Sequence, residues 1–465
     1  MRRPRGKDRF RRVGLVAIAA AAAALSLASP AQARERMITV KAPPAAGPAS
    51  YDRVFVHQFG PAKGRKILVL MPGTVAGAGN FTLIARRLVK RIKGLQVWAI
   101  DRRTQVLEDT SMFERGLAGT ATLQEVFDYY IGWIENGGTP ADHFDFKDQD
   151  TLSFARQWGM KVALNDARAV VRLANRRNRK VVLGGHSLGA SLAAAYAAWD
   201  FRGRAGFRDL DGIVLIDGGL LGSFDAVTTL QEAEDRIAEL NSGDPFADLL
   251  GIGFPEATGL FAEIGGLNAL KAPDASATAA QGSSLLPADF NPPFPVTNEA
   301  LLAHAFDRDT SPDTLRLLHV NAGGLAPAGD PRPWIDGNLT TAASLAKTFG
   351  QEPANGVEWF FPRRLTIDTD GANQMRQNAV ARFLGLRLRH TRRINIPIYA
   401  FQTDLTDGGV LRGARRLVGR ARTRKRQSLL VNGAPVQSHL DPLTAAPAKN
   451  RFLKSVERFL KRKAF

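Results

Sequence analysis

Cysteine is absent from this sequence of 465 residues, which excludes disulfide bonds, thiolate metal sites and a cysteine nucleophile. Acidic residues are also scarce, at 44 against 63 basic ones, and the formal net charge is +19. Many of the basic residues lie in 412–426, a run without interleaved aromatic residues and without a nucleic-acid-binding motif around it. We therefore expect a solvated helix face or attraction to an anionic cell surface, and no nucleic-acid partner.

Long apolar runs are also missing, apart from one of 15 residues at 13–27, which is too short to span a bilayer comfortably. Seven basic residues precede this run, and the small-residue site Ala31-Gln32-Ala33 follows it. This pattern predicts a signal peptide at 1–33 that is cleaved after Ala33, and hence a protein that is secreted or held in the cell envelope. The pair Arg11-Arg12 leaves the export pathway open, because the residues after it match a twin-arginine signal poorly. Residues 34–50, rich in proline and alanine, are expected to form a flexible lead-in.

From residue 51 onward, short apolar segments alternate with helical patterns, which is typical of an α/β fold with a mostly parallel sheet and helices on both faces. The expected strands are 66–71, 95–100, 180–183 and 212–216, and the expected helices are 81–93, 159–176 and 188–199. The alternation stops after residue 218 and resumes with strands at 394–401 and 428–431, before a closing helix at 448–459. We therefore predict a core of residues 51–218 and 391–465, with 219–390 inserted as a cap domain. Residues 102–157 show no clear pattern.

The motif Gly185-His186-Ser187-Leu188-Gly189 fits G-x-S-x-G, in which a serine occupies a sharp turn between a strand and a helix. Gly185 and Gly189 allow the backbone to turn without Cβ clashes, so that the Ser187 hydroxyl stands clear of the sheet. An expected strand precedes the motif directly and an expected helix follows it. Ser187 is therefore the candidate nucleophile.

A serine nucleophile needs a base, which is most often a histidine held by an acid. Of the seven histidines, His439 alone follows the last expected strands, so it is the candidate base. The acid is expected in the turn after strand 394–401, and Asp404 is the first choice because it lies close enough to the strand to be held rigidly. Asp217, at the end of the preceding strand, and Asp407, in the Asp-Gly turn, are alternatives.

Acyl transfer also needs backbone N–H groups that bind the oxyanion of the tetrahedral intermediate. The residue after the nucleophile, Leu188, supplies the first. The second is expected from Met71-Pro72-Gly73-Thr74, directly after an early strand, with Thr74 as the donor and Val75 as a weaker choice.

Together these segments resemble the α/β-hydrolase superfamily, and most closely its secreted lipase- and esterase-like members. The resemblance covers the two core segments, and it implies that Asp101-Arg102-Arg103 has a structural role. It implies a two-step acyl transfer by Ser187, His439 and Asp404 that needs no metal and no cofactor. It does not extend to the cap, so it does not identify the substrate.

A carboxylic ester with an apolar, lipid-like part is the expected substrate. The alternatives are a peptidase, amidase or acyltransferase with the same triad, and a binding protein that has kept only the fold. The apolar, glycine-containing stretch 246–264 suits a mobile lid over an acyl chain, although it suits ordinary cap core equally well. If it is a lid, Leu250 and Phe254 are expected to face the substrate.

Overall fold

The computed structural model describes residues 35–135, 142–224, 226, 229–350 and 356–465. The predicted signal peptide lies outside these residues and stays a prediction. Within the described ranges, no helix combines the length and the apolar character needed to cross a bilayer.

Eight strands form one mixed sheet in the order β1-β2-β4-β3-β5-β8-β11-β12. Their bounds are β1 Arg36–Lys41, β2 Arg53–Phe59, β3 Lys66–Met71, β4 Leu95–Asp101, β5 Lys180–His186, β8 Gly212–Ile216, β11 Ile398–Gln402 and β12 Leu429–Asn432. β2 pairs antiparallel with both β1 and β4, and all the other neighbours are parallel. The expected mostly parallel sheet is confirmed. The expectation of a flexible lead-in at 34–50 is wrong for β1, which pairs with β2 along its full length.

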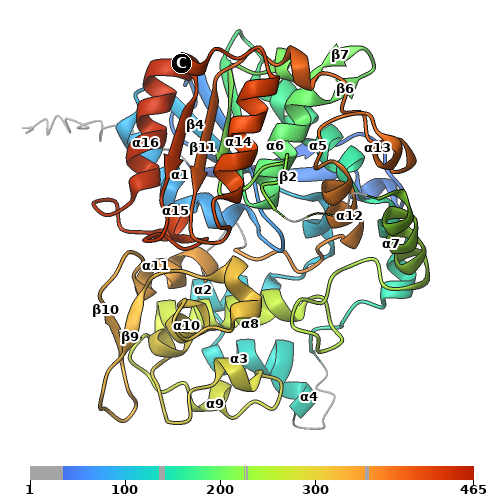
Figure 1. Cartoon of the computed structure of the whole chain (residues 1–465). Helices are drawn as coiled ribbons and strands as arrows, with labels where there is room; N and C mark the ends of the chain where they lie inside the picture. The colour runs from blue at the N-terminus through green and yellow to red at the C-terminus, as the bar shows by residue number, and fades with distance from the viewer. Residues whose placement is uncertain (1–34, 136–141, 225, 227–228, 351–355) are drawn as a thin grey trace, which may run out of the picture. The chain divides into compact units, whose positions relative to one another are not determined.

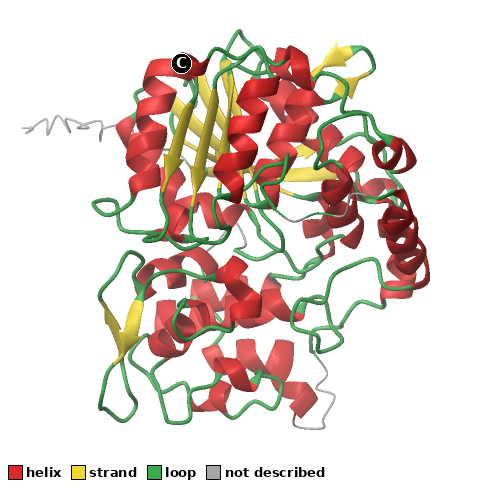
Figure 2. Ribbon diagram, in the orientation of Figure 1, coloured by secondary structure: helices red, strands yellow, loops and turns green. Residues whose placement is uncertain are grey.

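Helices cover both faces of this sheet, as the alternating pattern predicted (Figures 1 and 2). The apolar sides of α1 Thr82–Arg91 and α16 Arg451–Phe459 pack on one face. The other face is covered by α5 Met160–Ala174, α6 Leu188–Ala198 and α14 Gly409–Arg420. α6 is buried along its whole length, because its alanines allow it to lie close to the sheet. α14 instead buries Leu411, Ala414 and Leu417 and exposes arginines, so this part of the basic run is a solvated helix face.

The cap is built from two segments of the chain, of which the sequence pattern predicted only the second. Its apolar centre joins residues of 107–158, including Phe113 and Tyr130, to Leu260 of α8 (Ala257–Lys271) and to Trp359. The Trp359 ring lies 6.3 Å from Phe113, 6.0 Å from Tyr130 and 5.6 Å from Phe144, measured between ring centroids. The stretch 102–157 therefore belongs mostly to the cap.

Further short elements complete the cap and its junctions with the core. Those in the cap are α2 Ser111–Ala118, α3 Leu123–Phe127, α4 Trp133–Glu135, α8 Ala257–Lys271, α9 Thr278–Gln281, α10 Asn298–Phe306, β9 Gly323–Leu325, β10 Trp334–Asp336 and α11 Ala342–Phe349. Those beside the core are β6 Asp200–Phe201, β7 Arg204–Ala205, α7 Leu230–Ser242, α12 Arg363–Gly371, α13 Ala379–Phe383 and α15 Asp441–Thr444. Since α12 packs on α5 and on α7, both ends of the expected insertion 219–390 lie against the core and only its middle forms the cap.

Candidate active site

Ser187 occupies a strained turn between β5 and α6. Its backbone angles are φ 55° and ψ −124°, a conformation that residues with a Cβ seldom adopt. The flanking glycines make the turn possible: a Cβ on Gly185 would lie 2.3 Å from the Gly189 backbone, and one on Gly189 would lie 2.0 Å from the Met71 carbonyl oxygen. The strand–turn–helix setting that the motif predicted is therefore present.

His439 lines the same cavity as Ser187, and its partner is Asp217. His439 Nδ1 lies 2.5 Å from Asp217 Oδ2, and the two side chains are 1% and 0% exposed. Asp217 also accepts hydrogen bonds from the Thr403 backbone N–H, at 2.7 Å, and from the Thr403 hydroxyl. The carboxylate is thus held by three donors.

Asp404, the first choice for the acid, is not in contact with His439, and this expectation is wrong. Its carboxylate accepts hydrogen bonds from Ser438 Oγ at 3.0 Å and from Arg308 Nη1 at 3.1 Å. Asp407 is exposed and is also not the partner. At the end of β11, Thr403 faces the buried histidine–aspartate pair, so the next side chain, that of Asp404, is directed to the cap residue Arg308 instead.

Sheet order explains why Asp217 is the partner. β8, which ends just before Asp217, pairs directly with the Ser187 strand β5, whereas β11 is one strand farther away. The chain after Asp217 also passes very close to Ser187, because a Cβ on Gly218 would lie 2.1 Å from the Ser187 carbonyl oxygen. The sequence feature that could have indicated this close approach is the pair Gly218-Gly219 directly after Asp217.

The surroundings of His439 keep Asp217 charged and His186 neutral. Burial by itself would raise the pKa of Asp217, but hydrogen bonds from His439 and Thr403 outweigh it, and the pKa lies below its ordinary value. Burial, and then the charge of His439, lowers the pKa of His186 to about 3. His186 Nε2 lies 2.8 Å from the His439 carbonyl oxygen, so the neutral ring donates there and holds the loop of His439.

The residues of the two expected oxyanion donors lie beside Ser187. Leu188 is the first residue of α6, so its N–H has no partner within the helix. Thr74 lines the same cavity as Ser187. The loop of Thr74 is held by Arg102, whose Nη2 donates to the carbonyl oxygens of Pro72 at 2.7 Å and Gly73 at 2.8 Å. The other arm of Arg102 binds Glu358, which ties this loop to the cap.

Ser187 and His439 open into a cavity of about 20 Å³, with room for only one or two water molecules. Thr74 and His186 also line it, and its cap side is apolar, formed by Leu317, Leu318, Phe349 and Val357. No acidic or basic residue other than histidine is among the described residues that line it. Nor do the described ranges contain a group of three or more histidine and acidic side chains suited to a metal ion.

The stretch 246–264 divides between two environments. Leu250, Phe261 and Ile264 line a second, larger cavity inside the cap. Phe246 belongs to the apolar centre of the cap. Phe254 contacts Phe146, with ring centroids 4.3 Å apart, so the expectation that it faces a substrate cavity is wrong.

Four carboxyl groups meet where the cap joins the core; Asp101, Glu263 and Glu358 are buried, and Glu108 is partly buried. Asp101 ends β4, Glu108 accepts a hydrogen bond from the Trp359 backbone N–H, Glu263 accepts one from Trp359 Nε1, and Glu358 binds Arg102. Burial raises the pKa of Asp101 to about 7, and it raises the pKa values of Glu108 and Glu263 well above the ordinary range. The fold therefore retains protons here that an unfolded chain releases near pH 4.

The free energy of unfolding is expected to fall between pH 5 and pH 8, in part because of Glu263. Its stabilising effect is complete below the unfolded pKa and is lost as the pH rises toward the raised folded pKa, by up to about 1.4 kcal/mol per pH unit. Glu263→Gln removes this titration and keeps an oxygen for Trp359, so its unfolding curve should be flatter. Urea unfolding across this pH range measures the difference. The exposed Glu234→Gln is the control, and parallel curves for wild type and Glu263→Gln would contradict the prediction.

No family model and no curated protein matches the sequence. Solved structures that resemble the fold include a presumed lipase from Sulfolobus solfataricus, at 15% identity, 93% coverage of this chain, 95% of that chain and a TM-score of 0.49. Epoxide hydrolase A from Mycobacterium thermoresistibile matches at 14% identity, with 92% and 99% coverage and a TM-score of 0.42. A thermophilic esterase from Thermogutta terrifontis matches at 12% identity, with 92% and 100% coverage and a TM-score of 0.36. The order and directions of the eight strands, with a serine elbow after the fifth, give this chain the α/β-hydrolase fold.

Proposed function

We propose that this chain is an exported serine hydrolase that cleaves carboxylic esters with an apolar part, using Ser187, His439 and Asp217. The observation that supports this most directly is the buried His439–Asp217 pair at 2.5 Å, which lies beside a serine on a strained strand–helix turn. A structural role alone would not require the costly φ of Ser187 or a buried ionised carboxylate.

In the proposed reaction, Ser187 Oγ attacks the ester carbonyl carbon and gives its proton to His439 Nε2. Only Nε2 is available for this proton, because Nδ1 is bonded to Asp217. Asp217 stabilises the imidazolium that forms, and the N–H groups of Leu188 and Thr74 bind the oxyanion. His439 then protonates the departing alcohol. A water molecule, deprotonated by His439, attacks the acyl-enzyme, and the acid is released as Ser187 recovers its proton.

The apolar substrate class is supported by the walls of the Ser187 cavity. Its cap side consists of leucine, valine and phenylalanine side chains, and the described residues that line it offer no acidic, lysine or arginine side chain to bind an ionic substrate. Export is supported by the sequence of residues 1–33, and the mass of the protein recovered from outside the cytoplasm should show a chain that begins at Arg34.

The test of the activity is a panel of p-nitrophenyl esters run beside aminoacyl anilides, together with a fluorophosphonate probe. We expect ester turnover, little anilide turnover and one phosphonylated residue, Ser187, in the peptide map. Faster turnover of anilides would indicate an amidase or peptidase instead. If the esters are not cleaved and Ser187 is not labelled, the chain is a binding protein that has kept only the fold.

A further inference from the structure

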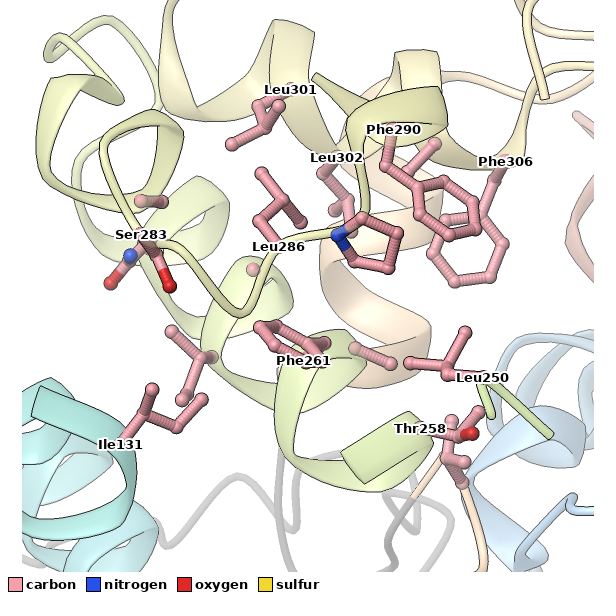
Figure 3. Close-up of a pocket in the computed structure, with 18 of the residues that line it drawn as sticks. Ile131, Leu250, Thr258, Phe261, Ser283, Leu286, Phe290, Leu301, Leu302 and Phe306 are labelled. Atoms are coloured by element: carbon pink, nitrogen blue, oxygen red, sulfur yellow. The ribbon is translucent and has the colours of Figure 1, made fainter. Parts of the chain in front are cut away.

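A second cavity, of about 110 Å³, lies inside the cap between α8, α10 and the loop of Leu286 and Phe290 (Figure 3). Its described lining residues are apolar except for Thr258, Asn268, Ser283 and Asn298, and none is charged. Two of these polar groups already have partners: Ser283 Oγ donates to Glu135 Oε1 at 2.6 Å, and Asn298 Nδ2 to the Ala272 carbonyl oxygen at 2.9 Å. The chemistry of these walls suits a hydrocarbon chain.

This cavity and the Ser187 cavity share a wall. Leu318 and Val357 line both of them. Phe306, which lines the cap cavity, also stacks on Phe349, which lines the Ser187 cavity, with ring centroids 4.5 Å apart. In Figure 3, Phe306 and Phe290 lie at one end of the cap cavity and Ile131 and Ser283 at the other. Because Phe306 contacts Phe349, the end at Phe306 is the one next to the Ser187 cavity.

The shared wall is fixed to the loops that carry the proposed catalytic groups. Val357 forms a backbone bridge with Ala76, two residues after Thr74, and the next N–H, that of Glu358, donates to the Val75 carbonyl oxygen at 3.1 Å. Leu318 is followed by His319, whose carbonyl oxygen accepts the N–H of Leu440, next to His439, at 3.0 Å. A chance packing void inside the cap would not be expected to lie next to the two segments that are hydrogen-bonded to these loops.

We propose that the cap cavity binds the acyl chain of the ester, which passes from Ser187 between Leu318 and Val357 toward Ile131. This inference rests on the function proposed above, and it adds the position and the length of the acyl group. The cavity has room for roughly eight water-sized groups, and a methylene group is about that size. Acyl chains of about six to ten carbons should therefore be preferred over acetyl.

Gly265→Leu tests the proposal by filling the cavity. Gly265 lies in the middle of α8 and lines the cavity, and a Cβ there would meet only Leu302 Cδ1, at an ordinary 3.5 Å. Leucine also forms helix better than glycine, so the substitution should fold. In wild type, we expect kcat/KM for p-nitrophenyl octanoate to exceed that for acetate by on the order of 100-fold. Gly265→Leu should lower this ratio at least about tenfold.

The control is Gly419→Leu on α14. A Cβ there would have no described neighbour within 4 Å, and Gly419 does not line a described cavity. The ratio of kcat/KM for octanoate to that for acetate should therefore stay at the wild-type value. An independent measurement uses wild type alone: an octyl fluorophosphonate should label Ser187 at least about tenfold faster than a methyl one. A wild-type ratio near one, or a ratio that Gly265→Leu leaves unchanged, would overturn the acyl site. Loss of acetate turnover and of all Ser187 labelling in wild type would instead overturn the proposed function.

Discussion

Asp217→Asn is expected to lower kcat by about 10⁴-fold, because the asparagine would hold His439 in the wrong tautomer. The Thr403 N–H donates to Asp217 Oδ1, so an asparagine would keep its carbonyl oxygen there and turn its NH₂ group toward His439 Nδ1. Nδ1 would then have to accept a hydrogen bond, and the ring proton would move to Nε2. In that state Nε2 cannot take the proton of Ser187. Steady-state kinetics with one ester at saturation measure the loss.

Asp404→Asn is the matched control for this substitution. It changes the same carboxylate to the same amide, but at a side chain that contacts Ser438 and Arg308 and not His439. We expect kcat to change by less than about tenfold, as for a surface ion pair. If Asp404→Asn were the more damaging of the two, the pairing seen in the structure would not be the catalytic one.

Ser187→Ala and His439→Ala are each expected to lower kcat by about 10⁶-fold, and the double variant should lose no more than either one alone. The reason is that the two side chains act as a unit: without the base the hydroxyl is not activated, and without the hydroxyl the base has no nucleophile to deprotonate. Each single variant and the double variant are compared with wild type in the same ester assay. Thermal unfolding of each variant shows whether the fold is kept.

Independent losses in the two single variants, which multiply in the double variant, would contradict a shared catalytic role. His186→Asn is an informative companion, because His186 is buried beside His439 and bonds its carbonyl oxygen without touching Asp217 in any described contact. A loss there as large as that of His439→Ala would mean that the base had been assigned to the wrong histidine.

Most of the sheet and the serine elbow could be predicted from the sequence, because both depend on neighbours along the chain. A buried parallel strand is a short apolar run, and the turn at Ser187 needs glycines at fixed spacing, so each leaves a local pattern. Two strands, β1 and β2, were missed. β1 is an edge strand next to a proline-rich segment, and five of its six residues are not fully buried. β2 is mostly buried, but His57 and Gln58 interrupt its apolar residues. Neither strand therefore shows the continuous apolar run that marks its neighbours.

The acidic partner of His439 could not be chosen from the sequence, although all three candidates follow expected strands. The choice depends on which strand lies beside β5 and on which side chain at that edge turns toward His439. Only the pairing of β8 with β5 and the contact of Thr403 with Asp217 decide it. Chain order alone selected His439 as the candidate base, because a single histidine follows the last strands.

By itself, the sequence determined the α/β core, the elbow of Ser187 and the late position of His439, since backbone preference and periodicity are local. Only the tertiary structure decided that Asp217 is the partner of His439 and that residues 107–158 complete the cap. It alone also placed the apolar cap cavity against the Ser187 cavity, through Leu318 and Val357. These features come from contacts between residues far apart in the chain, and such contacts are set by sheet order and by packing, which no local pattern records.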